Sequence, residues 1–201
     1  MDLTISLAST AELQDKLFEL RYRIYVEELG GKLPPGTCTG KRLRENLDSV
    51  AFNYVALDGE TVVGSLRVVD LDRLPDPAST ITRYRIKRLI ARFGAESICF
   101  AGRLAVDARY RSSGLVIKII ERGYAEARLR GLRFAVSDCS LYLLPLYERF
   151  GYRAYGEPFE DPIFGAKMRM LWSLRDVETM RRRRSPFARL AAELADHPLP
   201  L

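Results

Sequence analysis

The chain's 201 residues, of which 47% are hydrophobic and 29% charged, are typical of a globular protein with one domain or two small ones. A single histidine, His197, argues against Ser-His and Cys-His nucleophile pairs and against a histidine-built zinc site, so we expect no bound metal. The net charge of +6 favours an acidic or phosphate-bearing partner, and three cysteines without CxxC spacing indicate a reduced, cytoplasmic protein.

The N-terminal third predicts strands around one long helix. The expected elements are a strand at 3–8, a helix from Ser9 to Gly30-Gly31, a long loop at 32–48, and strands at 49–57 and 61–71. Ser9 and Glu12 have the spacing of a capping box, and Asp58-Gly59-Glu60 is typical of a hairpin turn. No basic region precedes the first apolar residues, which therefore indicate a strand and not a signal peptide.

The rest of the chain alternates helices with strands. The expected elements are a helix at 81–94, a strand at 97–106, helices at 113–131 and 140–151, strands at 134–139, 152–156 and 166–172, and a helical tail broken near Pro186. This order predicts an α/β protein with a mixed sheet flanked by helices.

One junction between a strand and a helix has the composition of an anion site. Residues 103–116, RLAVDARYRSSGLV, place cations, two serines and Gly114 where the helix at 113–131 begins. The first turn of a helix presents N–H groups without acceptors and the positive end of its dipole. We therefore expect Arg111, Ser112, Ser113 and Gly114 to hold a phosphate. The alternative is that the two serines only cap the helix.

The same junction resembles a known superfamily. Residues 111–116 resemble the RxxGxG/A signature of the GNAT acyltransferases, RLAVD resembles their central strand, and LYERFGY (146–152) resembles their second substrate-binding motif. The resemblance implies a GNAT-like mixed, splayed β-sheet flanked by helices at residues 1–172, followed by a basic helical extension at 173–201. It also implies an acyl thioester whose phosphopantetheine arm pairs with the backbone of Leu104, Ala105 and Val106. The phosphate of this arm would lie at residues 111–115, a range that ends at Leu115.

The acyl donor is expected to be transient, so no permanently bound cofactor is predicted. Val116 stands where the superfamily prefers Gly or Ala. A β-branched residue would crowd the pyrophosphate of coenzyme A, which favours the single phosphodiester of an acyl carrier protein. The alternative is a coenzyme A donor, with the valine tolerated after a small backbone shift.

Residues 20–30, LRYRIYVEELG, resemble the opening signature of two related groups, the acyl-homoserine lactone synthases and the long-chain N-acyl amino acid synthases. Three further segments, 44–49, 64–75 and 99–107, extend the resemblance. The matching residues are Arg21, Tyr25, Glu45, Asp48, Arg67 and Arg103. Phe100 replaces a glutamate that the lactone synthases use for S-adenosylmethionine, and Gly30-Gly31 replaces a tryptophan.

These departures favour the N-acyl amino acid synthases. The resemblance then implies an enzyme that moves a long-chain fatty acyl group from an acyl carrier protein to the amino group of an amino acid such as tyrosine. The alternatives are an acyl-homoserine lactone synthase, a CoA-dependent small-molecule N-acetyltransferase, and a basic module that binds nucleic acid or membrane without catalysis.

The acceptor would bring a carboxylate, which arginine binds bidentately. Arg21, Arg67 and Arg103 are therefore candidate ligands, and Phe100 is assigned to the same substrate-binding set. Arg67 and Arg103 lie in apolar strands, where a charge is costly unless it is paired. Internal ion pairs with Glu45 or Asp48 are the alternative to ligand contact.

Attack by the acceptor needs the free amine, so a base should assist. Without a histidine near the site, Glu45 or Asp48 is the predicted base, directly or through water, ahead of Glu28 and Glu96. The alternative is that these carboxylates are solvated loop charges. Tyr147 stands where many GNAT enzymes have a tyrosine acid, which would protonate the departing thiolate. The alternative is that its ring only packs.

Two basic segments complete the prediction. Residues 81–92 carry five cations without a carboxylate, which favours docking of an acidic carrier protein over a merely solvated helix face. The run RRRR (181–184) could instead lie on an anionic membrane surface. No DNA-binding motif is present, so no nucleic-acid partner is expected.

Overall fold

The computed structural model describes residues 3–195, so residues 1–2 and 196–201, His197 among them, lie outside the described part. The chain divides into two compact units. The first comprises the residues up to Val68 and Gly102–Gly123, and the second comprises Val69–Ala101 and the residues from Tyr124 onward. Within the described residues, seven strands pair in the order β1 (Leu3–Leu7), β4 (Phe52–Asp58), β5 (Thr61–Asp70), β6 (Ile98–Val106), β7 (Phe134–Ser140), β9 (Gly165–Ser173) and β8 (Arg153–Asp161). The strands β6 and β7 are parallel. The predicted mixed α/β sheet is therefore confirmed.

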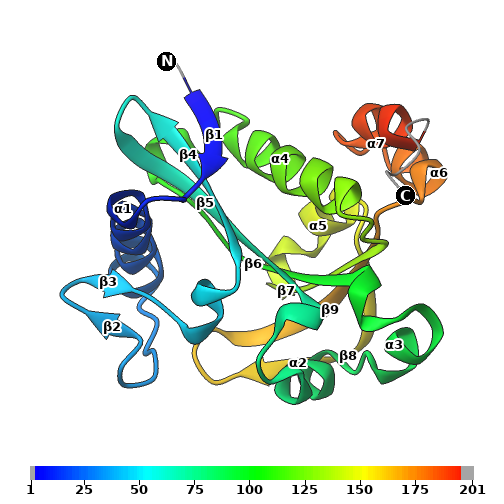
Figure 1. Ribbon diagram of the computed structural model, residues 1–201, viewed down its shortest axis with the longest axis horizontal. Helices are drawn as coiled ribbons and strands as arrows, with labels where there is room; N and C mark the ends of the chain where they lie inside the picture. The colour runs from blue at the N-terminus through cyan, green and yellow to red at the C-terminus, as the bar shows by residue number, and fades with distance from the viewer. Residues whose placement is uncertain (1–2, 196–201) are drawn as a thin grey trace. The chain divides into compact units, whose positions relative to one another are not determined.

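The first unit is built on the strands β1, β4 and β5 and on helix α1 (Figure 1). Its elements are β1 (Leu3–Leu7), α1 (Ala11–Tyr22), a π-helical turn (Arg23–Glu28), β2 (Cys38–Thr39), β3 (Arg42–Leu43), a 3-10 helix (Asn46–Ser49), β4 (Phe52–Asp58), β5 (Thr61–Asp70), the second half of β6 (Ile98–Val106), a 3-10 turn (Ala108–Tyr110) and the start of α4 (Leu115–Leu129). β4 pairs antiparallel with both β1 and β5, as the predicted hairpin requires.

The core of this unit explains why α1 lies where it does. Leu17, Phe18 and Leu20 on one side of α1 are buried in a cluster that includes Val55 of β4 and Ala105 of β6. Removing this apolar surface from water stabilises the unit. The residues on that face of α1 are thereby held against the strands that carry the candidate site.

The start of α1 differs from the prediction. Thr10, and not Ser9, caps the helix, because its backbone is extended and its hydroxyl accepts the N–H of Leu13 at 3.2 Å. Regular α-helix also ends earlier than predicted, at Tyr22, and a π-helical turn follows in which the N–H of Leu29 donates to the carbonyl of Ile24. The predicted loop at 32–48 contains the small β2–β3 hairpin.

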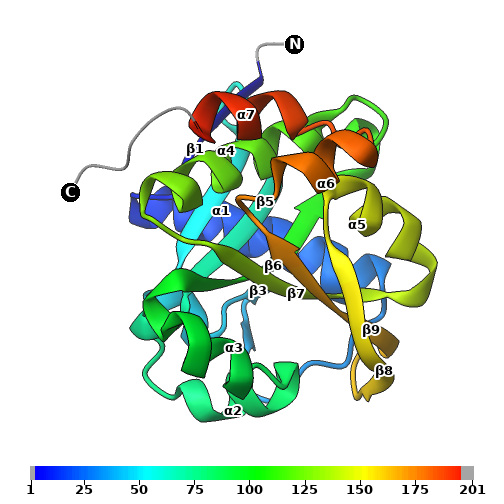
Figure 2. The same ribbon diagram turned by 90° about the vertical axis from the view of Figure 1, so that its right-hand side faces the viewer.

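The second unit contains the remaining strands and most of the helices. Its elements are α2 (Pro77–Tyr84), α3 (Lys87–Phe93), the first half of β6, the end of α4, β7 (Phe134–Ser140), α5 (Leu144–Phe150), β8 (Arg153–Asp161), β9 (Gly165–Ser173), α6 (Val177–Arg182), α7 (Ala188–Ala195), and 3-10 turns at 71–73, 95–97 and 141–143. Figure 2 shows β8 and β9 side by side, and they form an antiparallel pair.

The helix predicted at 81–94 is wrong as a single element. It is two helices, α2 and α3, separated at Arg85, whose φ of 51° is left-handed. The first of them starts earlier, at Pro77, where the Asp76 carboxylate caps it by accepting the N–H of Ala78 at 3.0 Å. The basic residues are thus distributed over two short helices.

The parallel ladder between β6 and β7 is short. It joins Ile98 to Phe134, Cys99 to Ala135 and Phe100 to Val136, although β6 continues to Val106 and β7 to Ser140. The opposite edge of β7 pairs with β9 over seven residues. A ladder that ends early is what a splayed sheet requires.

The C-terminal helices are fixed to the second unit by aromatic packing. Phe187, which is fully buried, lies 5.4 Å from the ring of Trp172 and the same distance from Phe150. Tyr124 stacks on Trp172 at 5.0 Å.

The division of the chain into two parts at residue 172 stays a prediction. None of the helices within residues 3–195 is long and apolar enough to cross a bilayer.

Candidate active site: an arginine–carboxylate cluster

The deepest charged side chain of the first unit is Arg21, which lies on α1 and has no exposed surface. Its Nη1 donates to Asp48 Oδ1 at 2.7 Å, and its Nη2 donates to Asn53 Oδ1 at 2.7 Å. Asp48 belongs to the 3-10 helix and Asn53 to β4. Arg21 therefore ties α1 to both, and its burial is tolerated because the charge is paired.

Glu45 gathers two further arginines from neighbouring strands. Arg67 on β5 donates from Nη1 to Glu45 Oε2 at 2.8 Å. Arg103 on β6 donates from Nε to the same oxygen at 2.5 Å and from Nη2 to Oε1. The backbone N–H of Glu45 donates to Asp48 Oδ2 at 2.8 Å. This hydrogen bond fixes the two carboxylates relative to each other at the start of the 3-10 helix.

The electrostatics of the cluster keep the Glu45 carboxylate ionised. Burial raises the pKa of Glu45, but the hydrogen bonds and charges of Arg103 and Arg67 outweigh it and hold the pKa at about 2. Burial lowers the pKa of Arg21, and the nearby Asp48 carboxylate opposes that effect. The Nε atoms of Arg21 and Arg67 are buried without a hydrogen-bond partner in the described part of the chain. The cluster thus retains two buried N–H donors that have no hydrogen-bond acceptor among the described residues.

The backbone of β6 is unusual beside this cluster. Arg103 has a φ of 51°, which is left-handed, in the interior of the strand. The Ser65 hydroxyl donates to the Arg103 carbonyl at 3.1 Å, and the Tyr25 hydroxyl donates to the Leu104 carbonyl at 2.8 Å. The ring of Tyr25 also lies 5.1 Å from the Arg103 guanidinium. Tyr25, Arg103 and Leu104, three predicted site residues, are therefore in direct contact.

The predicted phosphate turn follows β6 directly. Gly114 has a φ of 76° and precedes α4, so the N–H groups of Gly114, Leu115 and Val116 have no acceptor within the helix. The space at Gly114 is open, because an added Cβ would meet no atom within 4 Å. Ser113 donates its hydroxyl to the Tyr110 carbonyl at 2.7 Å, and Ser112 is exposed.

Arg111 is held against this turn by two contacts. Its Nε donates to the carbonyl of Val106 at 3.0 Å, and its Nη2 pairs with Glu28 at 2.6 Å. The hydrogen bond from Arg111 lowers the pKa of Glu28. The guanidinium is about half exposed, so it can contact an anion at the turn while its inner nitrogen stays on the backbone.

Two predicted site residues, Phe100 and Tyr147, belong to the second unit. Phe100 lies on β6, with its ring 5.1 Å from that of Tyr84. Tyr147 lies on α5, half-buried, with its ring 5.4 Å from that of Tyr152. Their assignments as substrate-binding and catalytic residues stay predictions, as do those of Glu45 and Asp48.

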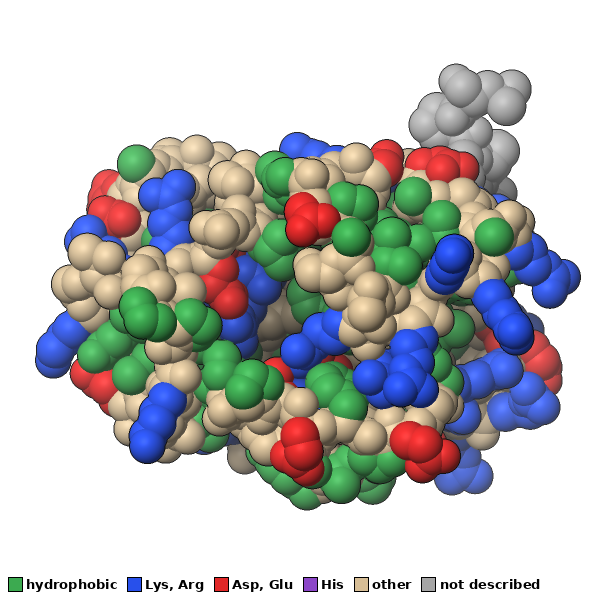
Figure 3. Space-filling model, turned by 90° about the horizontal axis from the view of Figure 1, so that it is seen from below, with side chains coloured by type: hydrophobic (Ala, Val, Ile, Leu, Met, Phe, Trp, Pro, Cys, Tyr) green, Lys and Arg blue, Asp and Glu red, His purple; other side chains and the backbone are tan. Residues whose placement is uncertain are grey.

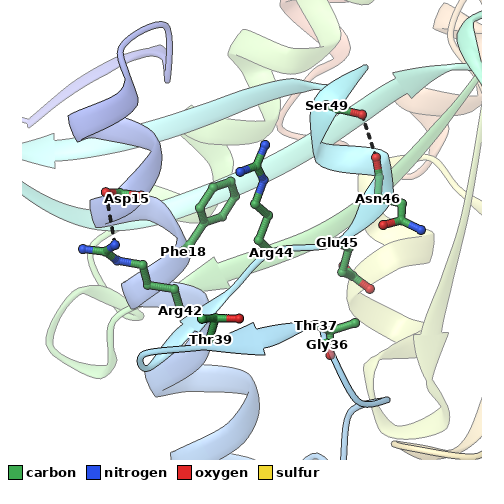
Figure 4. A pocket seen from close by; sticks show the side chains of 10 residues that line it. All are labelled: Asp15, Phe18, Gly36, Thr37, Thr39, Arg42, Arg44, Glu45, Asn46 and Ser49. Atoms are coloured by element: carbon green, nitrogen blue, oxygen red, sulfur yellow. Dashed lines mark hydrogen bonds and ion pairs between the residues drawn. The ribbon is translucent and has the colours of Figure 1, made fainter.

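Sequence reasoning missed a cavity of about 500 Å³ in the first unit (Figure 4). Its walls come from α1, the β2–β3 hairpin and the 3-10 helix, and the lining residues are Asp15, Phe18, Gly36, Thr37, Thr39, Arg42, Arg44, Glu45, Asn46 and Ser49. The Arg44 guanidinium lies 5.7 Å from the Phe18 ring, and Arg42 pairs with Asp15 at 3.3 Å. Glu45 therefore borders this cavity as well as the arginine cluster.

A second polar network, also missed, lies inside the second unit. Asp138 on β7 accepts from Lys167 at 2.7 Å and from the Tyr84 hydroxyl at 2.6 Å. Burial raises the pKa of Asp138, but Lys167 and Tyr84 outweigh it and lower the pKa below its ordinary value. An acid in an apolar strand was the available signal. These groups satisfy one another, which is typical of a structural network.

The basic segment at 81–92 is only partly available to a partner. Arg83 is used internally, since it pairs with Asp161 at 2.6 Å. The other four cations, Arg85, Lys87, Arg88 and Arg92, are exposed. Figure 3 shows Lys and Arg side chains on the face seen from below, with acidic side chains between them. In the tail, Arg183 donates to the carbonyls of Glu148 and Tyr152, while Arg181, Arg182 and Arg184 are exposed.

Comparison with known proteins identifies the family of the chain. The family model of the N-acyl amino acid synthase FeeM matches residues 16–173. The structure is similar to that of FeeM from uncultured soil microbes, with a TM-score of 0.72 and 11% identity over 94% of this chain and 97% of that one. None of the curated protein sequences matches the chain.

Two further solved structures share the fold. A CoA-dependent acyl-homoserine lactone synthase, BjaI, solved with SAM and isopentyl-CoA, has a TM-score of 0.67 and 20% identity over 92% of this chain and 90% of that one. An acyl-CoA N-acyltransferase from Pseudomonas aeruginosa has a TM-score of 0.60 and 19% identity over 86% of this chain and 99% of that one. The predicted GNAT-like fold is confirmed.

Proposed function

Because the chain belongs to the FeeM family of N-acyl amino acid synthases and is an acyltransferase, we propose that it moves a long-chain fatty acyl group from acyl carrier protein to an amino acid. The acceptor would be tyrosine-like, and its amino group would receive the acyl chain. The product is an N-acyl amino acid. The observation that carries this proposal is the arginine cluster around Glu45, which combines buried guanidinium groups with unused donors.

The cluster supports an acceptor that bears a carboxylate. Arg67 is almost fully buried, and its Nε has no partner among the described residues. A buried donor without an acceptor costs about 1–3 kcal/mol, which a bound carboxylate would recover. Arg67 and Arg103 both form ion pairs with Glu45. These ion pairs would hold the two guanidinium groups in place at the edge of the acceptor site.

The donor would lie along β6 and end at the turn before α4. In this proposal, the pantetheine amides pair with the backbone of Leu104–Val106, and the phosphate contacts the N–H groups at Ser112–Leu115. Arg111 supports this because its inner nitrogen is bound to the Val106 carbonyl and its guanidinium is half exposed. Val116 favours the single phosphodiester of a carrier protein over a pyrophosphate.

The chemical step is aminolysis of a thioester. The acceptor nitrogen attacks the thioester carbonyl carbon, the C–N bond forms, the C–S bond breaks, and the nitrogen loses a proton while the departing thiolate gains one. A backbone N–H at Leu104–Val106 would stabilise the oxyanion. Tyr147 would supply the proton to the thiolate.

Glu45 and Asp48 are proposed to assist removal of the acceptor's proton. An α-amino group has a pKa of about 8 and is mostly protonated at neutral pH. With a pKa of about 2, Glu45 is ionised throughout the physiological range and is a weak proton acceptor. We therefore assign it the task of attracting the ammonium group and orienting a water that carries the proton away.

The carrier protein would dock on the exposed cations Arg85, Lys87, Arg88 and Arg92 of the second unit. Carrier proteins are generally acidic, and complementary charge raises the rate of association. The exposed arginines of the tail are proposed to contact either the carrier protein or an anionic membrane surface.

The test is mass spectrometry of lipids extracted from cells that express the chain. The proposal predicts a new N-acyl amino acid, whose mass names the acceptor and the chain length together. An Arg67→Ala variant, which removes the buried guanidinium, should lose the product at equal protein level. An acyl-homoserine lactone, or only N-acetylated small amines, would contradict the proposal.

A further inference from the structure

The β6 strand contains a backbone conformation that its sequence does not favour. Within residues 3–195, four non-glycine residues have a positive φ, namely Lys41, Arg85, Arg103 and Arg184. Arg103 is the one that lies in the interior of a strand, since the other three are between or after elements. An arginine pays a steric cost at a φ of 51°, so the surrounding structure must impose this conformation.

Two hydroxyl groups hold the two backbone carbonyls that follow the distortion. Ser65, which is fully buried on β5, donates to the carbonyl of Arg103 at 3.1 Å. Tyr25 donates to the next carbonyl, that of Leu104, at 2.8 Å. The Arg103 side chain is held independently by both oxygens of Glu45. Backbone and side chain at this position are thus fixed by different groups.

Fixing a carbonyl fixes the N–H that shares its peptide plane. A trans peptide is planar, and its C=O and N–H point in opposite directions. The carbonyl of Arg103 shares a plane with the N–H of Leu104, and the carbonyl of Leu104 shares one with the N–H of Ala105. The hydroxyls of Ser65 and Tyr25 therefore aim the N–H groups of Leu104 and Ala105 away from themselves.

We propose that Ser65 and Tyr25 are positioning residues of the acyl-transfer reaction. Through the left-handed Arg103, they fix the amide planes of Leu104 and Ala105, so that one N–H of this pair points at the place where the thioester carbonyl develops its negative charge. The role of those amides rests on the proposed function, whereas the backbone geometry that the hydroxyls impose does not. Neither side chain touches the reacting atoms in this assignment.

The first experiment removes each hydroxyl and keeps the rest of the side chain. Ser65→Ala and Tyr25→Phe should each lower kcat about tenfold, because misaligned oxyanion donors cost transition-state stabilisation, and should change the donor KM less than about threefold. Ser6→Ala on β1 and Tyr22→Phe on α1 are matched controls, since no hydrogen bond is found for either hydroxyl in the described chain. Unchanged kcat, or an effect on KM alone, would overturn the proposal.

A second experiment separates positioning from simple loss of stability. Arg103→Gly and Arg103→Ala both lose the guanidinium, but only glycine accepts the left-handed backbone without cost. Ser65→Ala should therefore lower kcat less than about threefold in the glycine background and about tenfold in the alanine background. Equal effects in the two backgrounds would contradict a role through the Arg103 backbone.

Amide hydrogen exchange gives a readout that needs no turnover. Ser65→Ala should speed exchange at Leu104, and Tyr25→Phe should speed it at Ala105, with each effect larger than at Val55 in the same unit. Exchange that rises equally at all three amides would indicate general destabilisation and overturn the proposal. If no amino acid is acylated, kcat is measured with whichever amine the enzyme accepts, so failure of the acceptor assignment stays distinguishable.

Discussion

Replacing Glu45 by glutamine should make the protein less stable, in a way that depends on pH. The ordinary carboxyl pKa of 4.5 falls to about 2 in the folded protein, although burial opposes this, because Arg103 and Arg67 bind the charged form. The difference corresponds to about 3 kcal/mol of stability at neutral pH. The side chain is 20% exposed, so little of this is screened by solvent.

The sign of the pH dependence follows from the lowered pKa. The stabilisation is complete above pH 4.5 and is lost as the pH falls toward 2, where the folded protein also binds the proton. Integration gives a loss of about 1 kcal/mol at pH 4 and about 2 kcal/mol at pH 3. Glutamine has no proton to gain, so the stability gap between wild type and Glu45→Gln should shrink by these amounts.

Urea unfolding of both proteins at pH 7, 4 and 3 measures that gap. Glu60→Gln, in the exposed turn between β4 and β5, is the control and should change the free energy of unfolding by less than about 0.5 kcal/mol at each pH. A gap for Glu45→Gln that stays constant from pH 7 to pH 3 would refute the assignment of a strongly lowered pKa to this carboxylate.

Three further variants test other parts of the account. Arg111→Ala should raise the donor KM more than it lowers kcat, and unchanged donor kinetics, as expected for Arg109→Ala, would remove Arg111 from the phosphate site. Arg67→Lys, which loses the planar fork and its Nε, should raise the acceptor KM about tenfold in steady-state kinetics without a matching change for the donor. In urea unfolding, Arg103→Gly should have a free energy of unfolding about 1 kcal/mol higher than that of Arg103→Ala. Equal free energies would exclude strain in the backbone at position 103.

Local chemistry predicted that the buried arginines need an anionic partner, and the family resemblance named two candidate carboxylates. Arg67 and Arg103 lie in strands that are otherwise apolar, so the sequence indicated either a ligand or the carboxylates Glu45 and Asp48 as partners. Both arginines pair with Glu45, and Arg67 also approaches Asp48 at 3.4 Å. The same criterion applied to Asp138, an acid in the strand predicted at 134–139, would have indicated that it has a partner, which the structure shows to be Lys167.

Backbone conformations set by distant contacts could not be predicted. Arg103 has no left-handed preference of its own, and it adopts φ of 51° where Ser65 and Tyr25 bind the neighbouring carbonyls. The break between α2 and α3 at Arg85 is similar, because the periodicity of apolar residues continues through it. Tyr155 donates to the carbonyl of Tyr84 there, across 71 positions of sequence.

The choice between adjacent capping residues also depended on the folded chain. Ser9 and Thr10 are both good N-caps, and the sequence pattern with Glu12 favoured Ser9. The cavity at the β2–β3 hairpin was not predictable for a different reason. Apart from Asp15 and Phe18 of α1, its walls are formed by a segment that looks like a loop. The two strands in that segment have two residues each, which is too short for an alternating pattern.

The central claim is transfer from a carrier protein to an amino acid, and a donor competition tests it most directly. Purified protein would receive acyl carrier protein and coenzyme A carrying the same long chain with different isotopic labels, together with tyrosine and S-adenosylmethionine. The account predicts N-acyl tyrosine bearing the carrier-protein label, detected by liquid chromatography and mass spectrometry. An acyl-homoserine lactone, or a product bearing chiefly the coenzyme A label, would contradict it.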